Sequence, residues 1–286
     1  MTPPLPSSVP DRARASDLPS ANARALQVAV IGSGAIGGAV VEAIERGRVP
    51  DARLIAVLHS GSTPDELDRA IDEADVVVES TTVDAAAGFI PRVTATGTDI
   101  IVCSCGVFAR HENPRDLIAG VDSAATRPGR VLVPAGAVGG LDVLAAAARA
   151  GTEDARLRHY TIKSPAALGV TGRPGERHEV FRGSAREAAL QFPRTSNASV
   201  ALALATLGLD RAEVIVVADP QVTRTRHVVE WESPLGSYEM TFENSLDPDS
   251  GGRTSAITAW SVAELLIGIH DGVGPGAVVL EHPAGG

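Results

Sequence analysis

The fold of this chain follows from one segment, Leu26-Gln-Val-Ala-Val-Ile-Gly-Ser-Gly-Ala-Ile-Gly-Gly38. An apolar strand leads directly into glycines spaced as Gly-x-Gly-x-x-Gly, and a segment with helical periodicity follows up to Ile44. In this order the first glycine permits a tight turn, the second lets the backbone approach a pyrophosphate, and the third packs the helix against its strand. The amino terminus of the helix then presents unpaired N–H groups to the phosphates. The sequence therefore predicts a dinucleotide-binding site, with contacts from Gly32, Gly34, Ala35, Ile36 and Gly37.

The position that reads the cofactor ribose follows the next expected strand. Residues 53–58 form that strand and lead into His59-Ser-Gly-Ser62. An acidic residue about 20 residues beyond the fingerprint usually binds the ribose 2′-OH, and none stands in this segment. His59 and Ser60 are the predicted contacts, and a 2′-phosphate meets no carboxylate here unless Asp65 or Glu66 reaches back from the next helix. We expect NAD or NADP as the cofactor, with NADP accepted at least comparably to NAD.

Strands and helices alternate through the first half of the chain. Runs of consecutive β-branched residues fit strands that are covered on both faces, as in a parallel sheet. A capping box, with Pro64 at the first helical position, opens one of the helices. The fold class predicted for this half is α/β, a Rossmann-type doubly wound parallel sheet. The later elements are strands at 75–80, 99–103 and 130–134, and helices at 83–95 and 143–150.

The pattern changes after Gly151, where apolar and polar residues begin to alternate within the expected strands. Such alternation indicates antiparallel strands with one buried face. Strand parity places His227 on the covered face, together with Val229 and Trp231. The expected elements are strands at 156–163, 179–182, 227–232 and 238–243, and helices at 184–191, 197–207 and 254–267.

Four parts are expected along the chain. Residues 1–24 are rich in Pro, Ser and Ala and are predicted to be a flexible N-terminal extension. Residues 25–136 form the dinucleotide-binding domain, and residues 137–252 form a second α+β domain, built on an antiparallel sheet, for substrate binding and dimerisation. Residues 253–286 carry a helix that returns to the first domain.

Composition excludes several classes of function. A net charge of −10 and 3% aromatic residues, in 286 residues, exclude the basic patch and stacking platform of a nucleic-acid binder. No apolar run reaches the roughly 18 residues of a membrane span, so no membrane is expected as a partner. The cysteines, Cys103 and Cys105, fit neither a disulfide framework nor a zinc site, which indicates a reducing, cytoplasmic location. The seven histidines show no metal-binding spacing, and we expect no metal.

Taken together, the motifs resemble the L-aspartate dehydrogenase family over nearly the whole chain after residue 25. Several pieces occur in the family's order. Besides the fingerprint, they are Gly136-Ala-Val-Gly-Gly-Leu-Asp142, Gly183-Ser-Ala-Arg-Glu-Ala188, Phe192-Pro-Arg-Thr-Ser-Asn197, Ala218-Asp-Pro220, His227 and Arg253-Thr-Ser255.

The resemblance implies a homodimeric enzyme with an NAD(P)-binding domain joined to an α+β domain. It implies that Ala137 and Asn197 lie at the cofactor, that His227 is the catalytic acid/base, and that Lys163 pairs with a substrate carboxylate. The substrates implied are a dicarboxylic amino acid, or a 2-oxo acid with ammonia. The chain departs from the family pattern at three positions. The family has Asn where Thr195 and Thr225 stand, and Ser where Ala135 stands. These departures concern the substrate more than the fold.

Each predicted site residue also has a plain structural interpretation. His227 fits a core histidine bonded to a neighbouring carbonyl, Lys163 a solvated strand end, and Asn197 a helix cap. Glu79 and Asp142 suggest a carboxylate pair, but nothing in their spacing brings them together, and Asp219 fits a turn before Pro220.

The function expected from these observations is NAD(P)-dependent oxidoreduction of L-aspartate or a related amino acid, by oxidative deamination or by the reverse reductive amination. Two alternatives remain open. One is a diverged dehydrogenase or imine reductase of a specialised biosynthetic pathway, and the other is a cofactor-binding protein with little turnover. Two retained residues, Asn197 and His227, argue against the second alternative.

Overall fold

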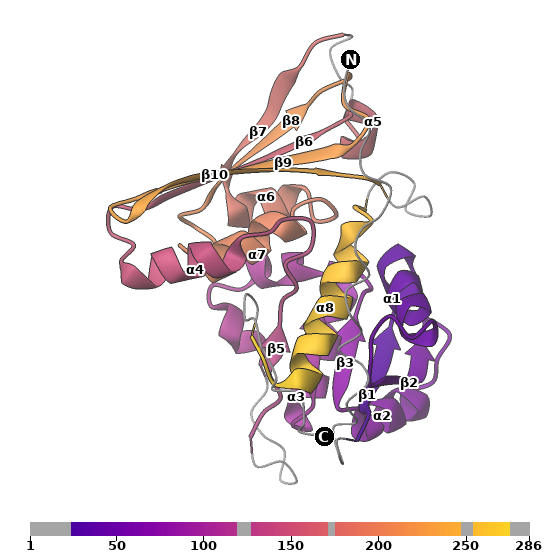
Figure 1. Ribbon diagram of the computed structural model, residues 1–286. Helices are drawn as coiled ribbons and strands as arrows, with labels where there is room; N and C mark the ends of the chain where they lie inside the picture. The colour runs from indigo at the N-terminus through magenta and orange to yellow at the C-terminus, as the bar shows by residue number, and fades with distance from the viewer. Residues whose placement is uncertain (1–23, 119–126, 171–174, 247–253, 275–286) are drawn as a thin grey trace, which may run out of the picture.

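The computed structural model describes residues 24–118, 127–170, 175–246 and 254–274. These residues form two five-stranded sheets, one above the other in Figure 1, with helices packed on and between them. The first sheet is parallel throughout, in the order β2-β1-β3-β4-β5. Its strands are β1 (Leu26–Ile31), β2 (Ala52–Leu58), β3 (Val76–Glu79), β4 (Asp99–Val102) and β5 (Val131–Leu132).

Helices cover both faces of the first sheet, which confirms the doubly wound arrangement. Helix α1 (Ala35–Glu45) and the C-terminal helix α8 (Ile257–Asp271) share one apolar cluster with β1 and β3. Helices α2 (Pro64–Glu73) and α3 (Val83–Ala95) pack on the opposite face. Because the chain steps outward from β1 to β2 and then returns to β3, the switch point lies at the carboxyl ends of β1 and β3, where ligands of such sheets bind.

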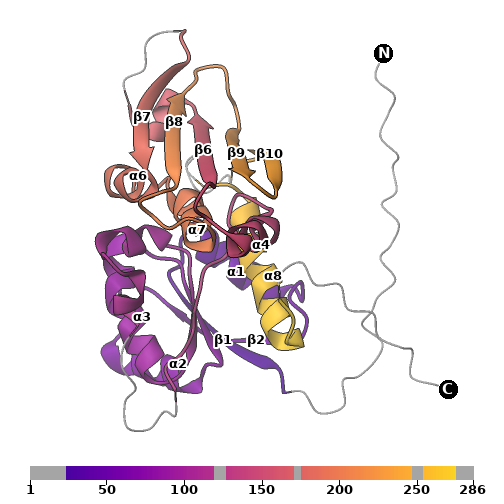
Figure 2. The same cartoon turned by 90° about the vertical axis from the view of Figure 1, so that its left-hand side faces the viewer.

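The second sheet has the order β10-β9-β6-β8-β7. Helices α4 (Leu141–Ala150), α6 (Ala185–Gln191) and α7 (Asn197–Ala205) lie between this sheet and the first one (Figure 2). A short helix, α5 (Pro165–Leu168), follows β6. The strands are β6 (Arg156–Lys163), β7 (His178–Ser184), β8 (Glu213–Ala218), β9 (Thr225–Ser233) and β10 (Gly236–Asn244).

The second sheet is mixed rather than wholly antiparallel. Three of its four neighbouring pairs are antiparallel, as the alternating sequence predicts, whereas β6 and β8 run parallel. Between these two strands the chain forms β7, α6 and α7, and it re-enters the sheet beside β6 in the same direction. A parallel neighbour needs such a long connection, and alternation within one strand does not reveal it.

The expected elements occur close to their predicted bounds, with two informative differences. Strand β5 is shortened to Val131–Leu132, so the segment after it is free to line a site. Two 3₁₀ helices that the sequence analysis did not predict, η2 (Cys105–Arg110) and η3 (Pro114–Leu117), follow β4. The predicted N-terminal extension lies outside the described residues, apart from Arg24.

Candidate functional site

The turn between β1 and α1 has the backbone that a dinucleotide requires. Gly32 has φ +105°, and a methyl group there would come within 2.6 Å of the Ser80 carbonyl oxygen. Gly37 packs so closely on Gly32 and the Ser80 hydroxyl that a side chain would collide with both. At Gly34, the N-cap of α1, a methyl group would meet no protein atom within 4 Å. That open space in front of a helix amino terminus fits a pyrophosphate.

One cavity, which we call the central cavity, lies between the two sheets. It brings together residues from α1, the end of β4, the segment after β5, and β6, β9 and α7. Five of the predicted site residues line it: Ile36, Ala137, Lys163, Asn197 and His227. Residues that the sequence analysis did not assign to a site line it too, among them Arg194, Thr254 and Thr258. Of the departures from the family pattern, Ala135 and Thr195 line the cavity, while Thr225 is buried on β9.

The segment after β5 is held at the cavity by both neighbouring layers. The Gly136 N–H donates to the Ser261 hydroxyl of α8 at 3.0 Å. The side-chain amide of Asn244, at the end of β10, donates to the Ala137 carbonyl at 2.7 Å. Ala137 therefore sits on a fixed backbone whose supports come from residues more than a hundred positions away.

His227 is 3% exposed on the covered face of β9, with Val229 and Trp231, which confirms the predicted parity. Its Nδ1 lies 3.0 Å from Nε2 of His159 and 3.4 Å from the Thr161 hydroxyl. Because Nδ1 faces these neighbours, Nε2 is the nitrogen left to meet a ligand in the cavity. Burial lowers the pKa of His227 well below its ordinary value, and His159 and Lys163 add to this effect. The imidazole is thus an unprotonated base at neutral pH.

Lys163, the last residue of β6, is 5% exposed and lines the same cavity. This burial contradicts a solvated strand end. Burial lowers the pKa of its ammonium group to about 8, so the group remains mostly protonated at neutral pH. A cation at the wall of a largely apolar cavity favours an anionic ligand.

Asn197 begins α7, but Ser196 is the N-cap and the Asn197 side chain does not cap the helix. Its Oδ1 accepts the backbone N–H of Gly106, in η2, at 3.0 Å. Because the side-chain oxygen is held by a donor, the NH₂ group is turned away from Gly106 and can donate to a ligand carbonyl in the cavity. This orientation suits recognition of a carboxamide.

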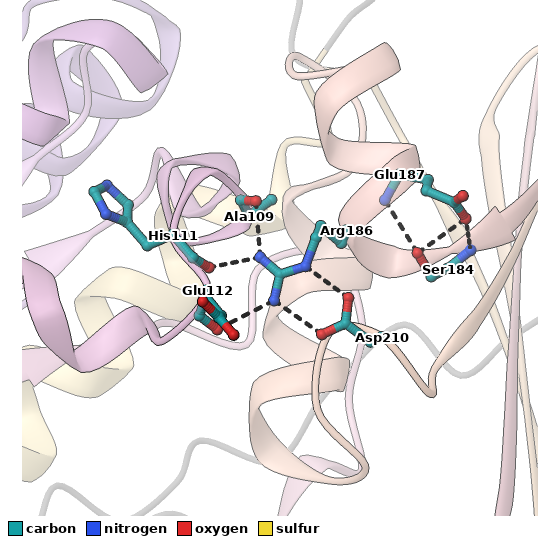
Figure 3. Close-up of polar contacts among 7 residues, drawn as sticks. All are labelled: Ala109, His111, Glu112, Ser184, Arg186, Glu187 and Asp210. Atoms are coloured by element: carbon teal, nitrogen blue, oxygen red, sulfur yellow. Dashed lines mark hydrogen bonds and ion pairs between the residues drawn. The ribbon is translucent and has the colours of Figure 1, made fainter.

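The segment Gly183 to Ala188 joins the two halves of the molecule (Figure 3). The guanidinium of Arg186, on α6, donates to the carbonyls of Ala109 at 2.9 Å and His111 at 2.6 Å, at and just after the end of η2. It also binds both carboxylate oxygens of Asp210, which orients the guanidinium. Arg186 therefore ties the second sheet's helical layer to the 3₁₀ helix that supports Asn197.

Glu79 ends β3 with its side chain fully buried and takes no part in a carboxylate pair. Its carboxylate accepts four hydrogen bonds, from the backbone and hydroxyl groups of Thr81 and of Ser104. It thereby joins the carboxyl ends of β3 and β4 at the cofactor side of the sheet. Asp142 is exposed in the first turn of α4.

The two cysteines are buried and line the central cavity. Burial raises the pKa of both thiols, with the Glu79 carboxylate as the second cause. A thiol kept protonated in this way is a poor nucleophile. Cys103 and Cys105 therefore act as small lining residues.

The segment after β2 borders a second hollow, lined by His59, Gly61 and Ser62 with residues of α2. The predicted capping box is confirmed: the Glu66 carboxylate accepts from the backbone and hydroxyl of Thr63 at 2.7 and 3.1 Å. Glu66 is therefore engaged at the helix start. Arg69, one turn further along α2, lines the hollow as well, and the sequence analysis did not identify it. Ser60 is exposed beside His59 and is not part of the hollow.

Asp219 shapes a turn, as the sequence predicts, because its carboxylate accepts the Gln221 N–H at 2.9 Å.

Among the described residues no group of three or more His, Cys, Asp or Glu side chains is arranged to hold a metal ion. Within the same residues no helix is both long and apolar enough to cross a membrane.

Sequence analysis also missed His159, which lies behind His227 and outside the cavity lining. Strand alternation over 156–163 already places it on the same face as Lys163. Its contact with His227 depends on the pairing of β6 with β9, in which Thr161 lies opposite His227. No local pattern carries that register.

Comparison with known proteins finds matches over most of the chain. The family model described as "Aspartate dehydrogenase, C-terminal" matches residues 142–269, and the model described as "Homoserine dehydrogenase, NAD binding domain" matches residues 32–134. The L-aspartate dehydrogenase of Methanopyrus kandleri is 34% identical over 266 residues, covering 87% of this chain and 97% of the relative. L-aspartate dehydrogenase 2 of Bordetella pertussis is 36% identical over 197 residues, covering 66% of this chain and 71% of the relative.

Among solved structures, the aspartate dehydrogenase of Thermotoga maritima superimposes with a TM-score of 0.64 at 24% sequence identity. The match covers 90% of this chain and 99% of that protein. It shows that the two chains share their fold.

Proposed function

This chain belongs to the L-aspartate dehydrogenase family, and we propose that it catalyses NAD(P)-dependent oxidative deamination of L-aspartate or a related amino acid, or the reverse reductive amination. The observation that carries the proposal is the central cavity, where a buried imidazole base, a buried lysine and an oriented amide face one another. A binding protein with little turnover would not need a base of lowered pKa in its ligand cavity.

The residues at the β1–α1 turn fit a dinucleotide, because the open space at Gly34 lies in front of the α1 amino terminus. We propose that Gly32, Gly34, Ala35, Ile36 and Gly37 hold the phosphates and the adjoining part of NAD(P). Ala137 would border the nicotinamide end, and Asn197 would donate its NH₂ group to the carboxamide. When bound, the cofactor supplies a hydride acceptor for the amino acid Cα.

His227 and Lys163 are the proposed catalytic residues. Oxidation leaves an imine, and Nε2 of His227 takes a proton from the water whose oxygen bonds to the imine carbon. The same nitrogen returns the proton when ammonia leaves. The Lys163 ammonium binds a substrate carboxylate as a point charge, and that carboxylate raises the lysine pKa back toward its ordinary value.

One experiment tests this proposal. Consumption of NADPH or NADH is followed with a panel of 2-oxo acids plus ammonia, first with the wild-type protein and then with His227→Ala. We expect turnover with oxaloacetate or a close relative, and a loss of roughly 10²- to 10⁴-fold in the variant at unchanged cofactor affinity. Cofactor binding without oxidation by any 2-oxo acid would instead identify a binding protein. A variant that keeps most of its turnover would remove His227 from the mechanism.

We propose that NADP is accepted at least comparably to NAD. Of the two carboxylates that line the hollow, Glu66 is engaged in its capping box and Glu73 is the last residue of α2, while Arg69 adds a cation to the same lining as His59 and Ser62. Arg69→Ala should therefore lower kcat/KM for NADPH more than for NADH, whereas Arg46→Ala, outside this hollow, should leave their ratio unchanged. A wild-type preference for NAD above roughly tenfold, or about 1.4 kcal/mol, would contradict the proposal.

We propose the domain division of residues 25–136 and 137–252, with residues 253–286 returning to the first domain, on the basis of the two sheets and the packing of α8 on α1.

A homodimer is proposed through the face of the second sheet opposite α4, α6 and α7, where Tyr160 and Val228 are partly exposed beside Ile162 and Ile215. Light scattering that gave the mass of one chain would exclude this assembly. A cytoplasmic location is proposed from the two free thiols.

A further inference from the structure

Two buried imidazoles lie next to each other beside the central cavity, and of the two only His227 lines it. His159, on β6, is 1% exposed, and His227, on β9, is 3% exposed. In the register of these antiparallel strands Thr161 lies opposite His227 and His159 lies opposite Val229, so the two histidines are diagonal neighbours on one face. Their rings stack, with centroids 5.1 Å apart and planes inclined by 26°. The mechanism described above uses only one of them.

A chain of hydrogen bonds connects the pair to the helical layer. The Ser199 hydroxyl of α7 lies 2.9 Å from Nδ1 of His159, and Nε2 of His159 lies 3.0 Å from Nδ1 of His227. The Thr161 hydroxyl is farther from the same His227 nitrogen, at 3.4 Å. A neutral imidazole carries one N–H, so the direction in which this chain donates decides which His227 nitrogen is protonated.

The surroundings keep both imidazoles neutral. Burial lowers the pKa of His159 to about 3. The charged group that acts on His227 from β6 is Lys163, and on β10 the residue opposite is Phe242. The other titratable groups at the cavity are Arg194, beside α7, and the two cysteines, whose thiols stay protonated. His227 is therefore paired with a neutral nitrogen, where many catalytic histidines are paired with a carboxylate.

We propose that His159 is a positioning residue, which holds His227 with its Nδ1–H directed at His159 and its Nε2 lone pair directed into the cavity. Ser199 completes the arrangement by accepting the Nδ1–H of His159. The inference rests on the proposed function, because it specifies how His227 is prepared to take a proton from water. A neutral partner stabilises the imidazolium less than a carboxylate does, so His227 remains a base at neutral pH and releases its proton readily.

A matched pair of variants tests the neutral partner. Gln and Glu both place a polar atom at the position of the His159 Nε2 and differ from each other mainly in charge. We expect His159→Gln to keep kcat within about threefold of wild type, because its amide oxygen accepts the same N–H. We expect His159→Glu to move the acidic limb of the kcat/KM pH profile upward by at least about one pH unit relative to His159→Gln. Equal profiles for the two variants would overturn the proposal.

Removing the partner should affect turnover but not cofactor binding. His159→Leu is expected to lower kcat by roughly 10- to 100-fold at unchanged NADPH affinity, and Thr161→Val should have a much smaller effect because its contact is longer. The reverse order of these two losses would assign the positioning role to Thr161. If His159→Leu does not fold, the Gln and Glu pair decides.

A measurement without turnover separates this inference from the proposed function. Long-range ¹⁵N–¹H NMR of the labelled wild-type protein reports the tautomer of each histidine. An Nδ1–H tautomer at His227, lost in His159→Leu, supports the proposal even if the substrate is not the one expected. An Nε2–H tautomer at His227 in the wild-type protein overturns it whatever the activity.

Discussion

At the scale of single residues, the glycines of the fingerprint have separable roles. Gly34 has φ −73° and ψ −169°, which any residue adopts, and a side chain there would point into open space. We expect Gly34→Val to change the free energy of unfolding by less than about 1 kcal/mol. It should weaken NAD(P) binding by at least about tenfold, or roughly 1.4 kcal/mol, because its methyl groups occupy the pyrophosphate position. Calorimetric titration and urea unfolding measure the two effects.

The matched control is Gly37→Ala, whose side chain would collide with Gly32 and Ser80. That variant should lose stability first and affinity only as a consequence. If Gly34→Val bound the cofactor like the wild-type protein, the pyrophosphate would not lie at this turn.

At the scale of elements, the position of η2 depends on α6. Arg186 binds two carbonyls at the end of η2 and both oxygens of Asp210, with its side chain only 20% exposed (Figure 3). A hydrogen bond to a charged group contributes about 1.5–3 kcal/mol to the stability of a protein. We therefore expect Arg186→Ala to lower the free energy of unfolding by about 2 kcal/mol. Because η2 also orients Asn197 through Gly106, the KM for the cofactor should rise as well. Urea unfolding and initial-rate kinetics measure the two changes.

Two further variants make this prediction specific. Arg186→Lys keeps the charge but not the planar fork, and should recover only part of the loss. Arg182→Ala removes exposed ion pairs to Glu179 and Glu213 within the second sheet, and should leave the cofactor KM unchanged. A cofactor KM in Arg186→Ala equal to that of the wild-type protein would show that η2 keeps its position without the clamp.

At the scale of the whole molecule, the buried histidines make stability depend on pH. The pKa of His159 is about 3 in the folded protein, and that of an unfolded histidine is about 6.5. Between these values the unfolded chain binds a proton that the folded protein does not, so the free energy of unfolding decreases as the pH falls below about 6.5. The decrease is about 1.4 kcal/mol per pH unit for each such histidine, and His227 acts in the same direction.

Urea unfolding at a series of pH values measures this slope. His159→Gln should have a shallower slope than wild type below about pH 6.5, since it removes one of the two buried imidazoles. His178→Gln removes a histidine outside the pair and serves as the control. Equal slopes for His159→Gln and wild type would mean that His159 is not held neutral by burial.

Features that lie within a few consecutive residues could be predicted from the amino-acid sequence. The strand, the three glycines and the helix of the fingerprint are contiguous, and the capping box at Thr63 to Glu66 spans four positions, so backbone geometry and local hydrogen bonds specify them. Alternation within β9 likewise places His227 on the buried face, because side chains of a strand alternate whatever its neighbours.

Which of these faces meet one another follows from the tertiary structure. The β6–β9 register brings His159 to His227, a long connection places β8 parallel to β6, and Arg186 reaches carbonyls that lie about 75 positions earlier in the chain. The short helix η2 forms where that guanidinium and Asn197 hold its backbone. These contacts join segments whose local sequences are compatible with many partners. Their selection depends on burying the apolar faces of the two sheets at the same time, which is a property of the whole chain.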